Sequence, residues 1–195
     1  MNSTNKKTEQ VKKLVLMALL TALVAVLAYL GGFIKLGSFA SINLTLVPVV
    51  VGAALYGPAA GAWLGGVSAA TFFLTADSAF WLGLSIPGTI ITVLVKGIMA
   101  GLCAGLVFNL LKNKNKYIAV IASAIVAPVV NTGIFIGGCF VFFIDAVQDM
   151  AATQGKSLWA YILIFFIGLN FVFELLANII LSPAILRIIN IRNKK

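Results

Sequence analysis

The sequence has little charge, no histidine and only two cysteines. Charged residues make up 10% of the chain and only five are acidic, whereas 62% of all residues are hydrophobic. Without histidine, and with Cys103 and Cys139 both inside apolar segments, neither a soft-metal site nor a disulfide framework is expected. A soluble domain of 195 residues could not hide so much apolar surface in one core. We therefore expect an integral membrane protein.

The same scarcity weighs against an enzyme. A membrane enzyme needs a nucleophile with a base, or a metal cluster, and of the five acidic residues only Glu174 lies in a long apolar run. The chain also has no GxxxxGK[ST] phosphate loop, so we expect no nucleotide hydrolysis and no cofactor in this chain.

Long apolar runs predict an all-α, six-helix transmembrane bundle, because a spanning helix needs about 20 apolar residues. The bundle is one domain over residues 13–189, between basic cytoplasmic tails at 1–12 and 190–195. The basic start is followed by no small-residue cleavage site, so the first run is expected to remain as a span. Pro58 should open a helix after the turn at Gly57, and Pro48 should kink the short second segment. The predicted segments are Leu14–Ile34, Asn43–Tyr56, Pro58–Thr75, Ile86–Leu111, Tyr117–Ile144 and Leu158–Ile189.

The placement of basic residues predicts that both termini face the cytoplasm. Eleven of the fourteen lysines and arginines lie near the two termini or between the fourth and fifth segments. The net charge of +9 is then a topology signal with some attraction to anionic lipids. Nucleic acid is not an expected partner, because the bases are spread over three loops without an aromatic platform. On the opposite side, residues 31–41, 75–85 and 145–157 are expected to form long loops that could act as a lid.

Three polar residues at one depth form the candidate substrate site. Lys96, Asn131 and Glu174 belong to three different predicted helices, each about 20 Å from the cytoplasmic helix end at 1.5 Å per residue. Charged groups inside a membrane are costly and usually face protein or water. We therefore expect these side chains to point into the bundle.

Further polar residues extend this candidate site. Ser85, Thr89 and Thr92 share one helical face with Lys96, and Asn170 and Asn178 lie one turn either side of Glu174. Trp81, in a neighbouring outer loop, either adds to the site or anchors the chain in the interfacial aromatic belt. The alternative is that these stripes, with a Lys96–Glu174 ion pair, only hold the helices together.

The first predicted helix has a face of small residues. Ala18, Ala22 and Ala25 lie in one narrow arc, which lets another helix approach closely. That helix could belong to a partner subunit or to this bundle.

The whole pattern resembles the substrate-binding S component of energy-coupling factor (ECF) vitamin transporters. The resemblance rests on six helices in under 200 residues, on the basic start and on three motifs. The motifs are Ala18-Leu-Leu-Thr-Ala22, the hairpin VPVVVGAALYGPAAGAWLGG at 47–66, and APVVNTGIF at 127–135.

The resemblance implies a high-affinity binding subunit in the cell membrane that captures a vitamin at the extracellular side. It implies that Ala18 and Ala22 pack on a transmembrane coupling subunit, and that two ATPase subunits with ATP and Mg²⁺ drive uptake. Lys96 favours an anion, which makes pantothenate the leading substrate, while Glu174 leaves folate, riboflavin, thiamine and cobalamin open. A self-sufficient permease and a purely structural subunit are the alternatives from other classes.

Overall fold

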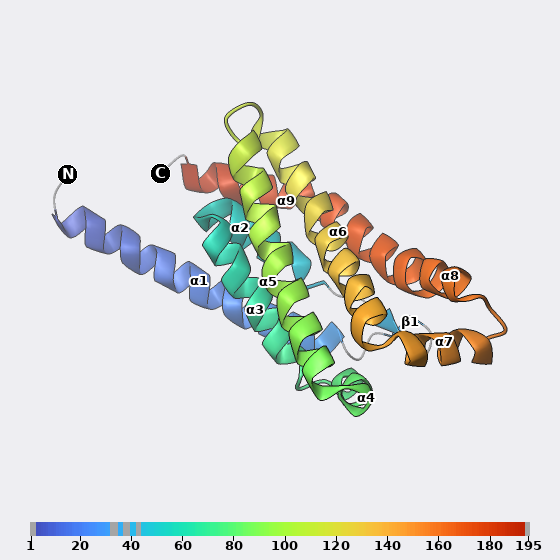
Figure 1. Cartoon of the computed structure of the whole chain (residues 1–195). Coiled ribbons are helices and arrows are strands. Elements are labelled where there is room, and N and C mark those ends of the chain that lie inside the picture. Colours follow the sequence, from blue (N-terminus) through green and yellow to red (C-terminus); the bar gives the residue numbers. More distant parts are fainter. Residues whose placement is uncertain (1–2, 32–34, 37–39, 42–43, 194–195) are drawn as a thin grey trace.

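The computed structural model describes residues 3–31, 35–36, 40–41 and 44–193, and this part of the chain consists of helices joined by short turns, with one short strand pair (Figure 1). The two strands are antiparallel, with Lys35 opposite Ser41. The helices are α1 (Ser3–Gly31), α2 (Leu46–Tyr56), α3 (Pro58–Phe72), α4 (Ala76–Leu84), α5 (Ile86–Leu111), α6 (Lys116–Phe142), α7 (Ile144–Thr153), α8 (Leu158–Tyr161), the π-helix η1 (Ile162–Phe171) and α9 (Val172–Asn193), and the strands are β1 (Lys35–Leu36) and β2 (Ala40–Ser41).

Several of these helices have the length and composition of membrane spans. Within the described ranges, α1, α5 and α6 each pass as a span. The pair α3 and α4, bent by 84°, adds a fourth if it counts as one broken span. Helix α2 has 11 residues, or about 16 Å, which is well short of a hydrocarbon core about 30 Å thick. The all-helical membrane class is thus confirmed, and the count of six spans stays a prediction.

Two segments expected to be loops are helices instead. Residues 75–85 contain α4 and residues 145–157 contain most of α7. Helix α4 is anchored at its start, where Ser78 Oγ donates to the backbone carbonyls of Thr75 and Phe73 at 2.7 and 3.2 Å. Helix α7 buries Val147 and Ala151 and leaves its polar residues outward. The mixture of small, polar and aromatic residues that suggested loops is therefore the composition of short amphipathic helices.

Other predicted boundaries also shift. Helix α1 begins at Ser3 rather than Leu14, so the basic segment before the apolar run continues the same helix. Helix α3 ends at Phe72 instead of Thr75, and α6 ends at Phe142 before α7 begins. The last segment is divided into α8, η1 and α9. Pro48 does not kink α2, because it lies in the first turn, where no intrahelical bond needs its N–H.

Glycines bring α3 and α5 into backbone contact. A Cβ atom at Gly61 would collide with the carbonyl of Gly101, and one at Gly65 with the carbonyl of Gly97. Small residues spaced by four are the usual basis of such close helix packing in membranes. The contact fixes the position of Gly97, and with it the position of the neighbouring Lys96.

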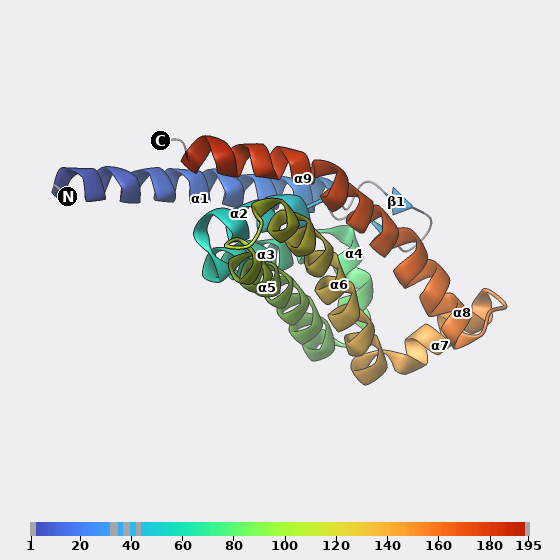
Figure 2. The same ribbon diagram turned by 90° about the horizontal axis from the view of Figure 1, so that it is seen from above.

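The elements separate toward two ends of the molecule. Figures 1 and 2 both place the N-terminal end of α1, the C-terminal end of α9 and the α5–α6 link toward one end of the molecule. Helices α4 and α7 and strand β1 lie toward the other end. Buried apolar clusters lie at both ends. One joins α2, α5, α6 and α9, and another joins the end of α6 to α7, α8 and η1. The polar cavity described next lies among α1, α2, α3, the start of α4, α5, α6 and α9.

Candidate functional site

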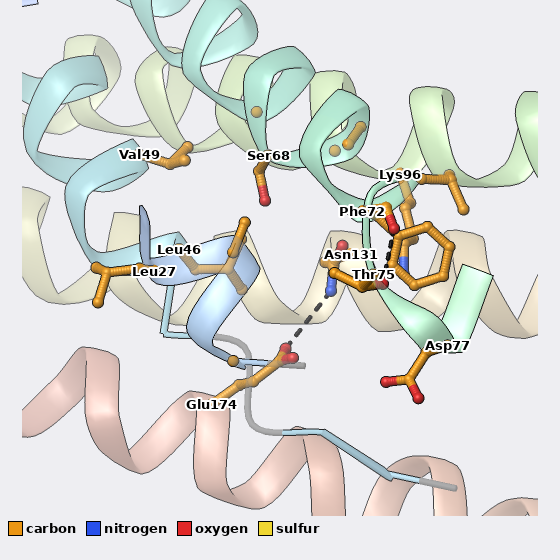
Figure 3. A pocket seen from close by; sticks show the side chains of 16 residues that line it. Leu27, Leu46, Val49, Ser68, Phe72, Thr75, Asp77, Lys96, Asn131 and Glu174 are labelled. Atoms are coloured by element: carbon orange, nitrogen blue, oxygen red, sulfur yellow. Dashed lines mark hydrogen bonds between the residues drawn. The ribbon is translucent and has the colours of Figure 1, made fainter. Parts of the chain in front are cut away.

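A cavity brings together the three polar residues predicted to share one depth. It is lined by Lys96 of α5, Asn131 of α6 and Glu174 of α9 (Figure 3). Its volume is about 100 Å³, room for on the order of seven to ten water molecules. A space of this size suits a small organic molecule.

Lys96 reaches the cavity with its ammonium group against aromatic rings. Its Nζ atom lies 4.8 Å from the ring centre of Phe135 and 5.8 Å from that of Phe72. An ammonium over a ring face is attracted by about 0.5–2 kcal/mol, more when water is excluded. The two rings therefore hold the charge at a defined place on the cavity wall.

Glu174 is almost completely buried, with 1% of its surface exposed. Its Oε2 atom accepts a hydrogen bond from Asn131 Nδ2 at 3.5 Å, drawn as a dashed line in Figure 3, while Oε1 has no hydrogen-bond partner. The ion pair between Glu174 and Lys96, considered from sequence as an alternative, is not formed: both residues are described, and no ion pair within 4.0 Å joins them. The cavity thus contains a carboxylate with unused acceptor capacity.

Thr89, Thr92 and Trp81 lie outside this cavity. Thr89 Oγ1 donates to the backbone carbonyl of Trp81 at 2.7 Å and so ties α5 to α4. Thr92 is buried at the α5–α6 contact, where a Cβ atom on Gly138 would collide with it. The indole of Trp81 packs edge-on against Phe135, with ring centres 5.3 Å apart. In the structure these three side chains thus contact neighbouring elements, and their role in substrate binding stays a prediction.

The stripe on the last helix also divides. Asn170 is in η1, and its side chain lies outside the described part of the structure. Asn178 Nδ2 donates to the carbonyl of Glu174 at 2.8 Å, and Ser182 Oγ donates in turn to the carbonyl of Asn178 at 2.9 Å. These bonds run along α9. Of the two described members of this stripe, Glu174 lines the cavity and Asn178 does not.

Several lining residues were not predicted. Phe72, Thr75 and Asp77 lie at the α3–α4 bend. Ser68 of α3 also lines the cavity, and its hydroxyl is hydrogen-bonded to that of Thr45 at 2.8 Å. Ser68 and Thr75 are seven residues apart, a spacing that places them on one helical face and was a usable signal in the sequence. Nothing in the local sequence indicates that the bend brings Asp77 to the cavity wall. The C-terminal end of α1 completes the lining with Leu27, Ala28 and Gly31.

The alanine face of α1 is open. Ala18 and Ala22 are exposed and Ala25 is half-buried, while α1 packs on α2 and α3 through Met17, Leu20 and Val24. At its edge, Trp63 Nε1 donates to Thr21 Oγ1 at 3.2 Å, and 60% of Trp63 is exposed. None of the three alanines lines the cavity.

Comparison with known proteins identifies one family. The family model described as "ECF transporter, substrate-specific component" matches residues 12–186, which is most of the chain. No curated protein and no solved structure shows a significant match. The matched range includes the alanine face, the α2–α3 hairpin, and Lys96, Asn131 and Glu174. The chain therefore belongs to the ECF transporter family of substrate-specific components, which makes it a substrate-binding transporter subunit.

Proposed function

We propose that the chain is the membrane-embedded, high-affinity binding subunit of an ECF-type importer and that it captures a vitamin at the extracellular side. The observation that carries this proposal is the cavity in which Lys96, Asn131 and Glu174 meet, within a chain matched by the family over residues 12–186. Charged and amide groups buried in a membrane protein are characteristic of substrate sites.

The proposed orientation is that of a six-span bundle with both termini in the cytoplasm. Basic residues at the two termini and in the α5–α6 link support it, because these segments lie toward one end of the molecule. The cavity is lined by the C-terminal end of α1 and the start of α4, which lie toward the other end. In this orientation the cavity is closer to the extracellular surface.

Pantothenate is the proposed substrate. A cavity of about 100 Å³ favours a small vitamin over folate, riboflavin or cobalamin. Lys96 supplies a positive charge for the carboxylate of pantothenate, and Asn131 and Glu174 supply partners for its hydroxyl and amide groups. Thiamine, a small cation, is the remaining alternative of similar size.

The proposed partners are a transmembrane coupling subunit and two ATPase subunits, which bind ATP and Mg²⁺. The exposed face of Ala18 and Ala22 supports docking on α1, since small residues let a second helix approach closely. The neighbouring indole of Trp63 is available to extend that contact. The chain itself then performs binding, and the partners perform hydrolysis.

Uptake of radiolabelled pantothenate into proteoliposomes tests this proposal. Vesicles with the chain alone are compared with vesicles that also contain the coupling and ATPase subunits, each with and without Mg-ATP inside. The proposal predicts uptake only in the complete, ATP-supplied vesicles. Uptake by the chain alone would identify a self-sufficient permease instead.

A further inference from the structure

The cavity holds two groups of opposite charge that do not neutralise each other. Lys96 and Glu174 both line it, yet among the described residues no ion pair within 4.0 Å joins them. In Figure 3 the end of Lys96 lies beside the ring of Phe72, whereas the carboxylate of Glu174 points toward Asn131. Each charge is therefore presented at its own part of the wall.

Aromatic side chains account for the position of Lys96. Phe72 ends α3 and Phe135 lies in α6, and the lysine Nζ is 5.8 Å from the first ring centre and 4.8 Å from the second. Phe135 is itself supported on another side by Trp81, with ring centres 5.3 Å apart. The attraction of the rings for an ammonium competes with the attraction of Glu174.

Glu174, unlike Lys96, has few partners for its charged group. Its carboxylate is buried, Oε1 has no partner, and Oε2 accepts only the 3.5 Å bond from Asn131. An ionised carboxylate offers about four acceptor positions, and leaving them empty in a buried site is costly. Hydrogen-bond donors from a ligand would fill them. The other lining carboxylate, Asp77, lies in the first turn of α4, where the helix N-terminus stabilises its charge.

We propose that the cavity recognises two opposite ends of one small molecule, an anionic group at Lys96 and hydrogen-bond donors at Glu174 and Asn131. Phe72 and Phe135 act as positioning residues that keep Lys96 from pairing with Glu174. This inference rests on the proposed binding function and deepens it by giving the feature that a substrate of this site must have and the residues that keep the two charges of the site apart. The substrate class is a small organic acid whose hydroxyl, amide or amine donors are separated from its acid group.

Isothermal titration of the purified full chain in detergent tests the proposal with four probes. Pantothenate carries both an acid group and donors, pantothenyl alcohol has the donors without the acid, nicotinate has the acid without the donors, and thiamine is a cation. The wild type should bind pantothenate at least about tenfold more tightly than the other three, the usual effect of losing a charged hydrogen bond.

Variants then separate the two ends of the ligand. Lys96→Met should bind pantothenate and pantothenyl alcohol with similar affinity, because it no longer recognises the acid. Glu174→Gln should weaken both ligands by a similar factor, about tenfold, and keep the preference for the acid. Phe135→Leu should reduce that preference, since Lys96 becomes free to pair with Glu174. Phe173→Leu is the matched control: Phe173 is 42% exposed on α9 and should leave the preference unchanged.

An unaltered acid preference in Lys96→Met would overturn the proposal, as would tighter binding of thiamine than of pantothenate or no binding of any probe. These results are separable from failure of the proposed function. A chain that assembles with the ECF subunits and supports uptake of a vitamin outside this class remains a binding subunit and contradicts only the ligand class. A chain that neither assembles nor supports uptake contradicts both.

Discussion

The alanine face of α1 yields a prediction that separates partner docking from substrate binding. Ala18 and Ala22 are one helical turn apart and exposed, so leucines at both positions would present two larger side chains to an approaching helix. Overpacking costs about 1–3 kcal/mol per site. The double variant Ala18→Leu/Ala22→Leu should therefore lose about 2–6 kcal/mol of assembly free energy, which weakens assembly roughly thirtyfold or more.

Native mass spectrometry of the chain titrated with the coupling subunit measures this loss, and isothermal titration of pantothenate measures substrate binding in the same sample. Substrate affinity should not change, because neither alanine lines the cavity. The fold should also persist, since lipid accepts leucine as readily as alanine. Leu23→Phe is the control: it enlarges an exposed position about 100° further round α1 than Ala22. Equal assembly of the double variant and the wild type would refute docking through this face.

Two further predictions concern the packing around the site. Gly97→Ala should lower the free energy of unfolding in detergent by about 1–3 kcal/mol, because its Cβ would collide with the Gly65 carbonyl. Gly133→Ala meets open space and should be neutral or slightly stabilising, so equal thermal stability of the two variants would contradict the proposed α3–α5 packing. Thr89→Val removes the bond to the Trp81 carbonyl and should cost about 1 kcal/mol of stability without changing substrate affinity. A tenfold loss of affinity in calorimetry would instead place Thr89 in the site.

Long-range features of this chain are predictable because membrane solvation imposes them. Apolar runs gave the helical class, and the predicted bounds of α5 agree with the structure at both ends. Spacing along the helices was enough to suggest that Lys96, Asn131 and Glu174 share one depth, and all three line one cavity. A charged group in a membrane has few stable positions, so its place is strongly constrained.

Short-range features were less predictable. Thr89 and Thr92 are spaced like Lys96, but sequence cannot tell whether a hydroxyl faces a cavity or a neighbouring helix. The Lys96–Glu174 ion pair, considered as the alternative to a substrate site, left out the rings of Phe72 and Phe135, which come from other helices and compete for the ammonium. The bend after α3, which places Asp77 at the cavity, depends on tertiary packing that no local pattern encodes.

The most direct test of the account is mass spectrometry of the small molecules released from the purified wild type and from Lys96→Met, prepared side by side. The account predicts that a small organic acid co-purifies with the wild type and is strongly depleted in the variant, while both proteins remain folded. The same molecule retained at equal amounts in both would show that the cavity of Lys96, Asn131 and Glu174 is not the substrate site.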